Sequence, residues 1–367
     1  MAIASVIVGI LILLVVLVDT FETVIVPRTV SRPLRLANLL VSVLWKGWRA
    51  IGRRLTRRRE AWLGSFGPLS LVVLIVCWAM LLALGFSFIQ AGLETPLSGD
   101  PNPNFAVHLY MSATTLFTLG YGDMTALDGP GRAVSVIEAG VGFGFLAVVV
   151  GYLPVLYQSF SRREATILLL DARAGSPPAG CELLCRSADD LRSLARLLGE
   201  FEHWSASLLE SYLSYPILAY YRSQHDKLTW LGSITAVLDA CSLIELGFKE
   251  KLEGHKELGR QAEHTFAIAR HLIVDLSYIV GAPPMQGTAD RLPSEVMRAI
   301  HLKLDSVGLQ LHRSADAEKA LALRRREYEP YLEGLAHHLL LTVPPIWNEK
   351  DAPDSWQASA WDDVAHF

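Results

Sequence analysis

Thr118-Leu119-Gly120-Tyr121-Gly122-Asp123 is the stretch that decides the fold of this 367-residue chain. Glycine adopts a positive φ without a penalty from a Cβ atom, so Gly120 and Gly122 allow backbone conformations that other residues avoid. Such conformations let the carbonyls of successive residues point to one side, where rings of them can replace the hydration shell of a cation. The stretch is therefore predicted to coordinate ions through its backbone.

This stretch resembles the selectivity filter of the potassium-channel superfamily, whose signature T-V/I/L-G-Y/F-G-D follows a short pore helix. The resemblance implies that K⁺ is the permeant ion, that no organic cofactor is needed, and that the filter residues are Thr118, Leu119, Gly120, Tyr121 and Gly122. It also implies that Tyr121 braces the filter and that Asp123 lies at its outer mouth. Asn104 can cap a helix that runs to about residue 117, too short to cross a membrane, which fits a re-entrant pore helix.

The hydrophobic residues are concentrated in the first 160 residues, and the mean hydropathy of +0.31 is high for a soluble protein. Three apolar runs, within residues 3–26, 69–89 and 130–160, are long enough to cross a hydrocarbon core of about 30 Å. We therefore expect an all-α membrane protein with three transmembrane helices, a re-entrant pore helix and a helical cytoplasmic domain. The expected boundaries are 1–27 for the first span, 28–64 for a basic interfacial segment and 65–160 for the pore domain, followed by a linker (161–180), a helical domain (181–345) and a loose tail (346–367).

Residues 28–60 carry ten basic residues and one acid, and their polar side chains recur at helical spacing. This pattern predicts an amphipathic helix in the headgroup plane, with tryptophans at the interface and arginines on lipid phosphate. The positive-inside rule then places the segment in the cytoplasm and both the N-terminus and the filter outside. Asp19 and Glu22, at the end of the first span, are expected to pair with arginines of this segment; an ion site there is the alternative.

The last apolar run resembles the inner helix of bacterial two-transmembrane potassium channels, which begins with a Gly-Arg pair, here Gly131-Arg132. The resemblance implies a gating hinge at Gly142, and Pro154 is expected to kink the helix. Glu138 is an ionisable residue inside the membrane, which is usually functional or paired. We expect it to support the filter from behind through Thr114 or Thr115; a glutamate that merely faces the outer vestibule is the alternative.

The second half of the chain is acidic, with 22 Lys and Arg against 29 Asp and Glu after residue 160, which argues against a nucleic-acid partner. Helices are expected from about residue 187 and over 225–247, 255–280, 294–311 and 315–342. Residues 215–225 group hydrogen-bonding side chains and are a candidate site for an unidentified cytoplasmic ligand. Cys181 and Cys185 have a spacing that can bind metal, but without a second pair they are interpreted as ordinary thiols.

These observations predict a passive potassium-selective channel of the inner membrane, surrounded by lipid, with its C-terminus in the cytoplasm. One pore segment per chain supplies a quarter of a filter, so a homotetramer is expected. A weakly selective monovalent cation channel is the first alternative. A membrane-anchored signalling protein is the second, but no catalytic constellation is found after residue 180, so the chain is not expected to be an enzyme. The gating stimulus is not encoded in any recognisable motif.

Overall fold

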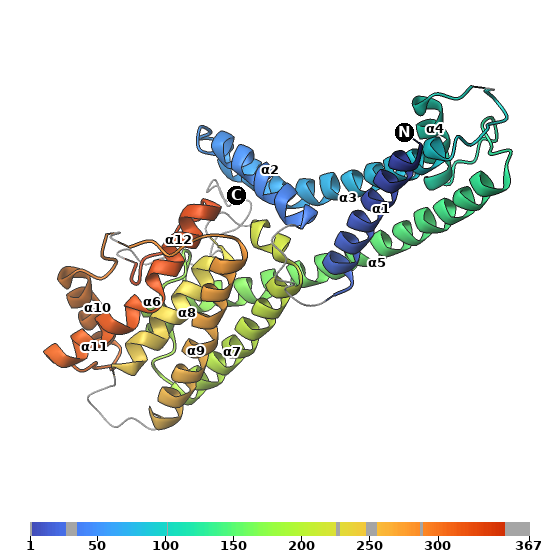
Figure 1. The fold of residues 1–367 in the computed structure, drawn as a ribbon. Helices are drawn as coiled ribbons and strands as arrows, with labels where there is room; N and C mark the ends of the chain where they lie inside the picture. The colour runs from blue at the N-terminus through green and yellow to red at the C-terminus, as the bar shows by residue number, and fades with distance from the viewer. Residues whose placement is uncertain are drawn as a thin grey trace, which may run out of the picture. The chain divides into compact units, whose positions relative to one another are not determined.

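The computed structural model describes residues 2–26, 35–100, 102–224, 228–246, 255–286 and 289–348. These residues are all-α, without a strand among them, and include three helices long and apolar enough to cross a membrane (Figure 1). The chain forms two compact units, residues 1–158 and 159–367, here called the first and the second unit.

The first unit contains α1 (Ala2–Val24), α2 (Leu36–Gly52), α3 (Arg59–Gly92), α4 (Phe105–Leu116) and the first part of α5 (Gly129–Ala174). The membrane-span candidates are α1, α3 and α5. In Figure 1, α1 lies along α3, while α4 lies at the end of α3 where the chain leaves that helix. Three helices that could cross a membrane and a short helix before residues 118–123 are therefore present, as expected.

Small residues let α1 and α3 approach each other closely. A Cβ atom on Gly9 would lie 2.5 Å from the carbonyl oxygen of Gly85, and one on Gly92 would lie 2.7 Å from that of Ala2. The Ser5 hydroxyl donates to the carbonyl of Phe88 over 2.8 Å. Because lipid tails give no hydrophobic drive for helix association, such close backbone packing and hydrogen bonds stabilise helix pairs within a membrane.

A pair of tryptophans joins α2 to the start of α3. The rings of Trp48 and Trp62 stack with their centroids 4.0 Å apart, and each indole N–H donates to the other residue's carbonyl, over 2.9 and 3.2 Å. Helix α3 begins at Arg59, and Pro68 lies inside it. Trp45, expected at a lipid interface, is buried beside Phe66.

The second unit begins with the end of α5 and continues with α6 (Gly180–Arg186), α7 (Leu191–Ser214), the short 3₁₀ helix η1 (Pro216–Tyr220), α8 (Trp230–Glu245), α9 (His255–Ile279), α10 (Ser294–Ser306), α11 (Ala315–Arg326) and α12 (Glu329–Leu339). Helix α9 packs against α7 and α8. The range 315–342, expected to be one helix, is two helices that break before Tyr328, whose fully buried ring packs on Phe266. Tertiary packing here overrides a continuous helical pattern.

Two expected boundaries change in the structure. Residues 161–180 were expected to be a linker, but α5 continues to Ala174, and Ile167 and Leu170 are buried in the second unit. The loose tail was expected from residue 346, yet Ile346 is buried and its carbonyl accepts the N–H of Cys181 over 3.0 Å. Both segments supply apolar side chains to the core, which the composition of short stretches does not reveal. Residues 349–367 lie outside the described residues.

Candidate functional site

Helix α4 is set by a cap at its start. The Asn104 side chain accepts the backbone N–H groups of Ala106 and Val107, over 2.9 and 3.2 Å. This satisfies two of the amides that have no partner within the first turn of a helix. The helix ends at Leu116 after 12 residues, about 18 Å at 1.5 Å per residue, which cannot cross a bilayer. A short helix is thus present where a pore helix was expected.

The six residues after Phe117 form an irregular segment in which the sign of φ alternates from one residue to the next. The φ angles are +56° at Thr118, +55° at Gly120 and +77° at Gly122, whereas Leu119 and Tyr121 are not in the left-handed region. Amides at the start of the segment bond to the end of α4: those of Leu119 and Gly120 donate to the carbonyl of Thr114 over 2.8 and 3.3 Å. The positive φ at Thr118 was not expected, because a β-carbon normally disfavours it.

The segment lies at the surface of a single chain. The side chains of Leu119 and Tyr121 are 54% and 68% exposed. Asp123, which follows, accepts a hydrogen bond of 2.9 Å from the hydroxyl of Tyr110 on α4. Tyr110 therefore ties the end of the segment to the pore helix, a contact that the sequence motif alone did not indicate.

The start of α5 is tied to the end of α3 by one buried amide. The Gln90 side chain donates to the carbonyl of Gly131 and to the hydroxyl of Ser135 over 3.1 and 3.2 Å, and it accepts from Thr95 over 2.7 Å. Arg132 donates to the carbonyl of Ala126 over 3.0 Å. Gly131 thus attaches the start of α5 to the end of α3, while Arg132 binds the loop that precedes α5.

Gly142 lies against the end of the pore helix. A Cβ atom there would be 2.1 Å from the carbonyl oxygen of Leu116, so the position has no room for a side chain. Helix α5 is unbroken from Gly129 to Ala174, and Pro154 lies inside it. The structure thus gives Gly142 a packing role, and the hinge expected there and the kink expected at Pro154 stay predictions.

Glu138 is fully buried on the face of α5 that points to the pore helix. Neither carboxylate oxygen accepts a well-formed hydrogen bond among the described residues; the polar group that faces it is the hydroxyl of Ser112. The expected partners are different: the hydroxyls of Thr114 and Thr115 both donate to the carbonyl of Met111, over 2.9 and 2.8 Å. Glu138 therefore forms no hydrogen bond to either threonine in this structure, because each hydroxyl donates within α4; its support of the filter stays a prediction.

Asp19 and Glu22 on α1 have separate partners. The Asp19 carboxylate accepts the indole N–H of Trp78 over 2.8 Å and the backbone N–H of Ala37 over 3.2 Å. The Oε2 atom of Glu22 lies 3.8 Å from the Nε atom of Arg35. Among the described residues, which omit 27–34, the expected arginine pairing is found for Glu22 but not for Asp19, which joins α1, α2 and α3 at one point. No ion site is needed to explain either carboxylate.

In the second unit, the residues just beyond the membrane span are held by the stretch that was a candidate ligand site. The guanidinium of Arg163 donates to the carbonyls of Leu218 and Tyr221, over 3.1 and 3.0 Å, and its side chain is 2% exposed. Next to it, Glu164 accepts from Ser223 over 3.1 Å. Residues 215–224 thus bind α5 at Arg163 and Glu164; His225, also part of that prediction, lies outside the described residues.

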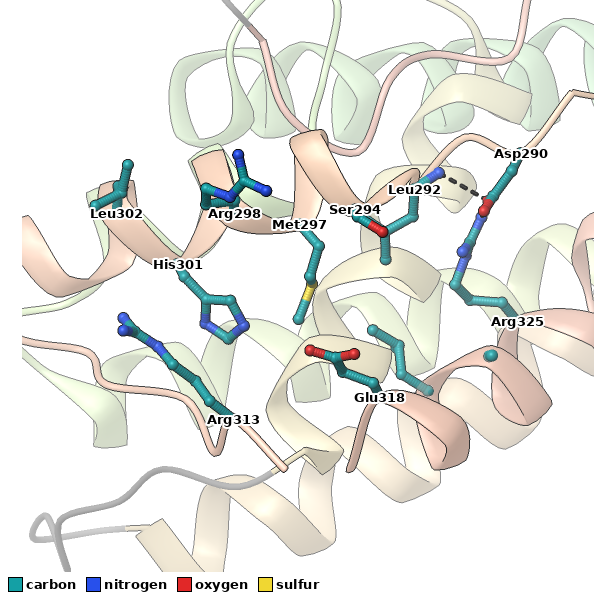
Figure 2. Close-up of a pocket in the computed structure, with 12 residues that line it drawn as sticks. Asp290, Leu292, Ser294, Met297, Arg298, His301, Leu302, Arg313, Glu318 and Arg325 are labelled. Atoms are coloured by element: carbon teal, nitrogen blue, oxygen red, sulfur yellow. Dashed lines mark hydrogen bonds and ion pairs between the residues drawn. The ribbon is translucent and has the colours of Figure 1, made fainter. Parts of the chain in front are cut away.

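A cavity of about 470 Å³ lies between α10 and α11 in the second unit (Figure 2). Beside it, Arg325 pairs with Asp290 over 2.7 Å and with Glu329 over 2.9 Å, and Arg291 pairs with Asp239 over 2.6 Å. Burial raises the pKa of Glu329 above its usual value, although both arginines act in the opposite direction. This ion-pair network was not expected, since its members are distant in sequence.

Comparison with known proteins locates a family match in the first unit. Residues 69–158, from α3 to the middle of α5, match the family model described as an ion channel. The chain is similar to the uncharacterized membrane protein YdjJ of Bacillus subtilis (strain 168), with 23% identity over 258 residues, 68% of this chain and 72% of the relative.

Protein LctB of Bacillus caldotenax is 36% identical over 89 residues, which are 21% of this chain and 64% of LctB. No solved structure matches the chain. The described helices and these relatives indicate a multi-pass membrane protein, and its residues 69–158 support the function of an ion channel.

Proposed function

We propose that four copies of this chain form a potassium-selective channel whose filter is residues 118–122. The observation that carries the proposal is the alternation of positive φ at Thr118, Gly120 and Gly122 directly after a capped 12-residue helix. Alternating hand along a backbone turns successive carbonyls to the same side. A column of such oxygens can replace the hydration shell of K⁺.

The surface of α5 supports assembly with further copies. Only 11% of an 18-residue apolar stretch of α5 is buried, against 50% of the corresponding stretch of α3. The exposed side chains include a stripe at alternating spacings of three and four residues: Phe143 (69%), Leu146 (55%), Val150 (62%), Leu153 (44%) and Tyr157 (70%). This spacing is typical of helices that pack lengthwise against each other. Together with the exposed filter segment, it favours a closed ring of copies around a central axis, and four copies complete a filter of this type.

The channel is proposed to lie in the inner membrane, with the filter outside and the second unit in the cytoplasm, since the basic residues between α1 and α3 favour the cytoplasmic side. Residues of the second unit that follow α5 would then meet cytoplasmic solutes. Conduction is passive in this proposal, with K⁺ as the permeant ion and no organic cofactor.

Reversal potentials of the purified protein in planar bilayers under opposed K⁺ and Na⁺ gradients test the proposal. A potential close to the K⁺ equilibrium value is expected. A potential near zero would establish the weakly selective cation channel instead, and absence of any current would contradict channel function. Native mass spectrometry is expected to give four times the 40.5 kDa of one chain.

A further inference from the structure

The cavity between α10 and α11 exists because these helices pack on different partners. Helix α10 packs on α6, whereas α11 packs on α8 and α12. The facing sides of α10 and α11 therefore remain apart and line the space seen in Figure 2. Its volume of about 470 Å³ falls in the range of about 300–1,000 Å³ that is usual for small-molecule sites.

The walls combine apolar and charged groups. Leu292, Met297 and Leu321 are buried residues that provide an apolar floor. On the α10 side, Arg298 is exposed and forms no ion pair within the described part of the chain. On the α11 side, the Glu318 carboxylate likewise has no ion-pair partner among the described residues. An arginine and a carboxylate thus line one space, and neither has an ion-pair partner among the residues that the structure describes.

A third charged group lies at the inner end of the cavity. Arg325 is 7% exposed, and its charge is shared between Asp290 and Glu329. An anion that enters the cavity would compete with Asp290 for this guanidinium. Arginine favours carboxylates and phosphates because its planar donors match them in pairs.

We propose that this cavity binds a small organic anion that also carries hydroxyl or amino groups, and that its binding controls the pore. Arg298 and Arg325 would hold the anionic group, Glu318 would accept from the donor groups, and the apolar floor would contact the carbon skeleton. The second clause rests on the channel function proposed above, whereas the first does not.

Contacts continue from the cavity to the inner helix through α12. Glu329, the partner of Arg325, is the first residue of α12. At the other end of this helix, the carbonyls of Leu339 and Leu340 accept from Arg222, over 2.5 and 3.1 Å. Arg222 is next to Tyr221, whose carbonyl binds Arg163 on α5. A change at Glu329 can therefore reach the end of the inner helix through one short helix and two guanidinium groups.

Such a series of contacts transmits a signal only if the ligand favours one of two arrangements. The candidate element is the Arg325 guanidinium, which pairs with Asp290 and Glu329 and for which an entering anion would compete. Weakening these pairs would free the start of α12 to shift. Because Arg222 holds the other end of α12, the shift would act on the residues that bind Arg163.

Binding is measured first, by calorimetry on the full-length protein in lipid nanodiscs. The probes are adenosine 5′-monophosphate, L-glutamate and inorganic phosphate, each alone. At least one organic probe is expected to bind saturably, and Arg298→Ala is expected to weaken it about tenfold, the effect of losing one charge-assisted hydrogen bond. Arg260→Ala, an exposed arginine on α9 away from the cavity, is the matched control and should bind like the wild type.

Three outcomes would overturn the site. Neither organic probe binds; or Arg298→Ala and Arg260→Ala bind alike; or inorganic phosphate binds as tightly as the organic probes, which would mean that the apolar floor and Glu318 contribute nothing. None of these depends on ion conduction, so the site and the channel function fail separately.

Control of the pore is measured next, as K⁺ efflux from liposomes with and without the bound probe. The probe is expected to change the initial rate of the wild type several-fold. Arg222→Ala should bind the probe normally but lose its effect on the rate, and Arg163→Lys, which keeps the charge but not the paired donors, should weaken that effect. Equal responses of the wild type and Arg222→Ala would overturn the transmission through α12. Wild-type liposomes without any K⁺ efflux would contradict the channel function itself.

Discussion

Gly142 on α5 meets the carbonyl oxygen of Leu116 at the last turn of the pore helix, where a Cβ atom would lie only 2.1 Å from that oxygen. The inner helix and the pore helix therefore touch through backbone at this point. The segment proposed as the filter begins two residues after Leu116, so this contact fixes the base from which that segment starts. It links α5 to the segment proposed as the filter without any side chain.

Gly142→Ala is therefore expected to disturb the filter. The added methyl group forces α4 and α5 apart, at a cost of about 1–3 kcal/mol for overpacking. Gly144→Ala is the matched control, because a Cβ atom there meets nothing within 4 Å in the single chain and alanine favours a helix. Thermal unfolding and K⁺ flux of both variants check the prediction. If Gly142→Ala unfolds and conducts like Gly144→Ala, the close approach is not important.

Gly120→Ala should abolish K⁺ flux while leaving the helices folded. Within the single chain a Cβ atom at Gly120 meets nothing within 4 Å, so the expected strain comes from φ, which is +55°. The left-handed conformation costs a residue with a β-carbon about 1–2 kcal/mol, and the cost recurs in each copy of the filter. Liposome flux is compared with circular dichroism of the same preparation. Wild-type flux in the variant would refute the filter assignment.

Glu138 is predicted to stabilise the region behind the filter through Ser112. Glu138→Gln keeps the shape and supplies donors, so it should conduct with an altered lifetime of the open filter. Glu138→Ala leaves a cavity beside Ser112 and should reduce the K⁺ over Na⁺ permeability ratio. Single-channel recordings in bilayers measure both quantities. Should the alanine and glutamine variants both behave like the wild type, Glu138 has no part in supporting the filter.

Asp19→Ala should destabilise the first unit by about 1–3 kcal/mol, because the buried indole N–H of Trp78 and the backbone N–H of Ala37 lose their acceptor. Asp19→Asn keeps an acceptor oxygen and should lose less stability. Glu22→Ala is the control, since its 3.8 Å pair with Arg35 is long. Thermal unfolding in detergent ranks the three variants. An order in which Glu22→Ala loses most would contradict this account.

Cys185 should react with iodoacetamide before Cys181 and Cys241. A hydrogen bond from Cys181 lowers the pKa of the Cys185 thiol, the same bond and burial raise that of Cys181, and burial raises the pKa of Cys241. At pH 8 Cys185 therefore holds the largest thiolate fraction of the three, and it is also the least buried. Peptide mapping by mass spectrometry after timed labelling gives the order. Faster labelling of Cys181 would contradict the direction assigned to this pair.

The sequence by itself determined the features that depend on local pattern. The lengths of the apolar runs predicted three membrane helices, and Asn104 predicted the start of the pore helix. The filter motif predicted positive φ at its two glycines, because only a residue without a Cβ atom adopts it freely. These features are set within a few residues along the chain.

Only the tertiary structure decided which residues meet across the chain. Glu138 lies beside Ser112 and forms no hydrogen bond to the expected threonines, and Asp19 accepts a hydrogen bond from Trp78. Gly142 lies against the carbonyl of Leu116. These contacts depend on how helices are rotated about their own axes when they pack. That rotation follows from the fit of all the facing side chains together, which no single motif along the sequence contains.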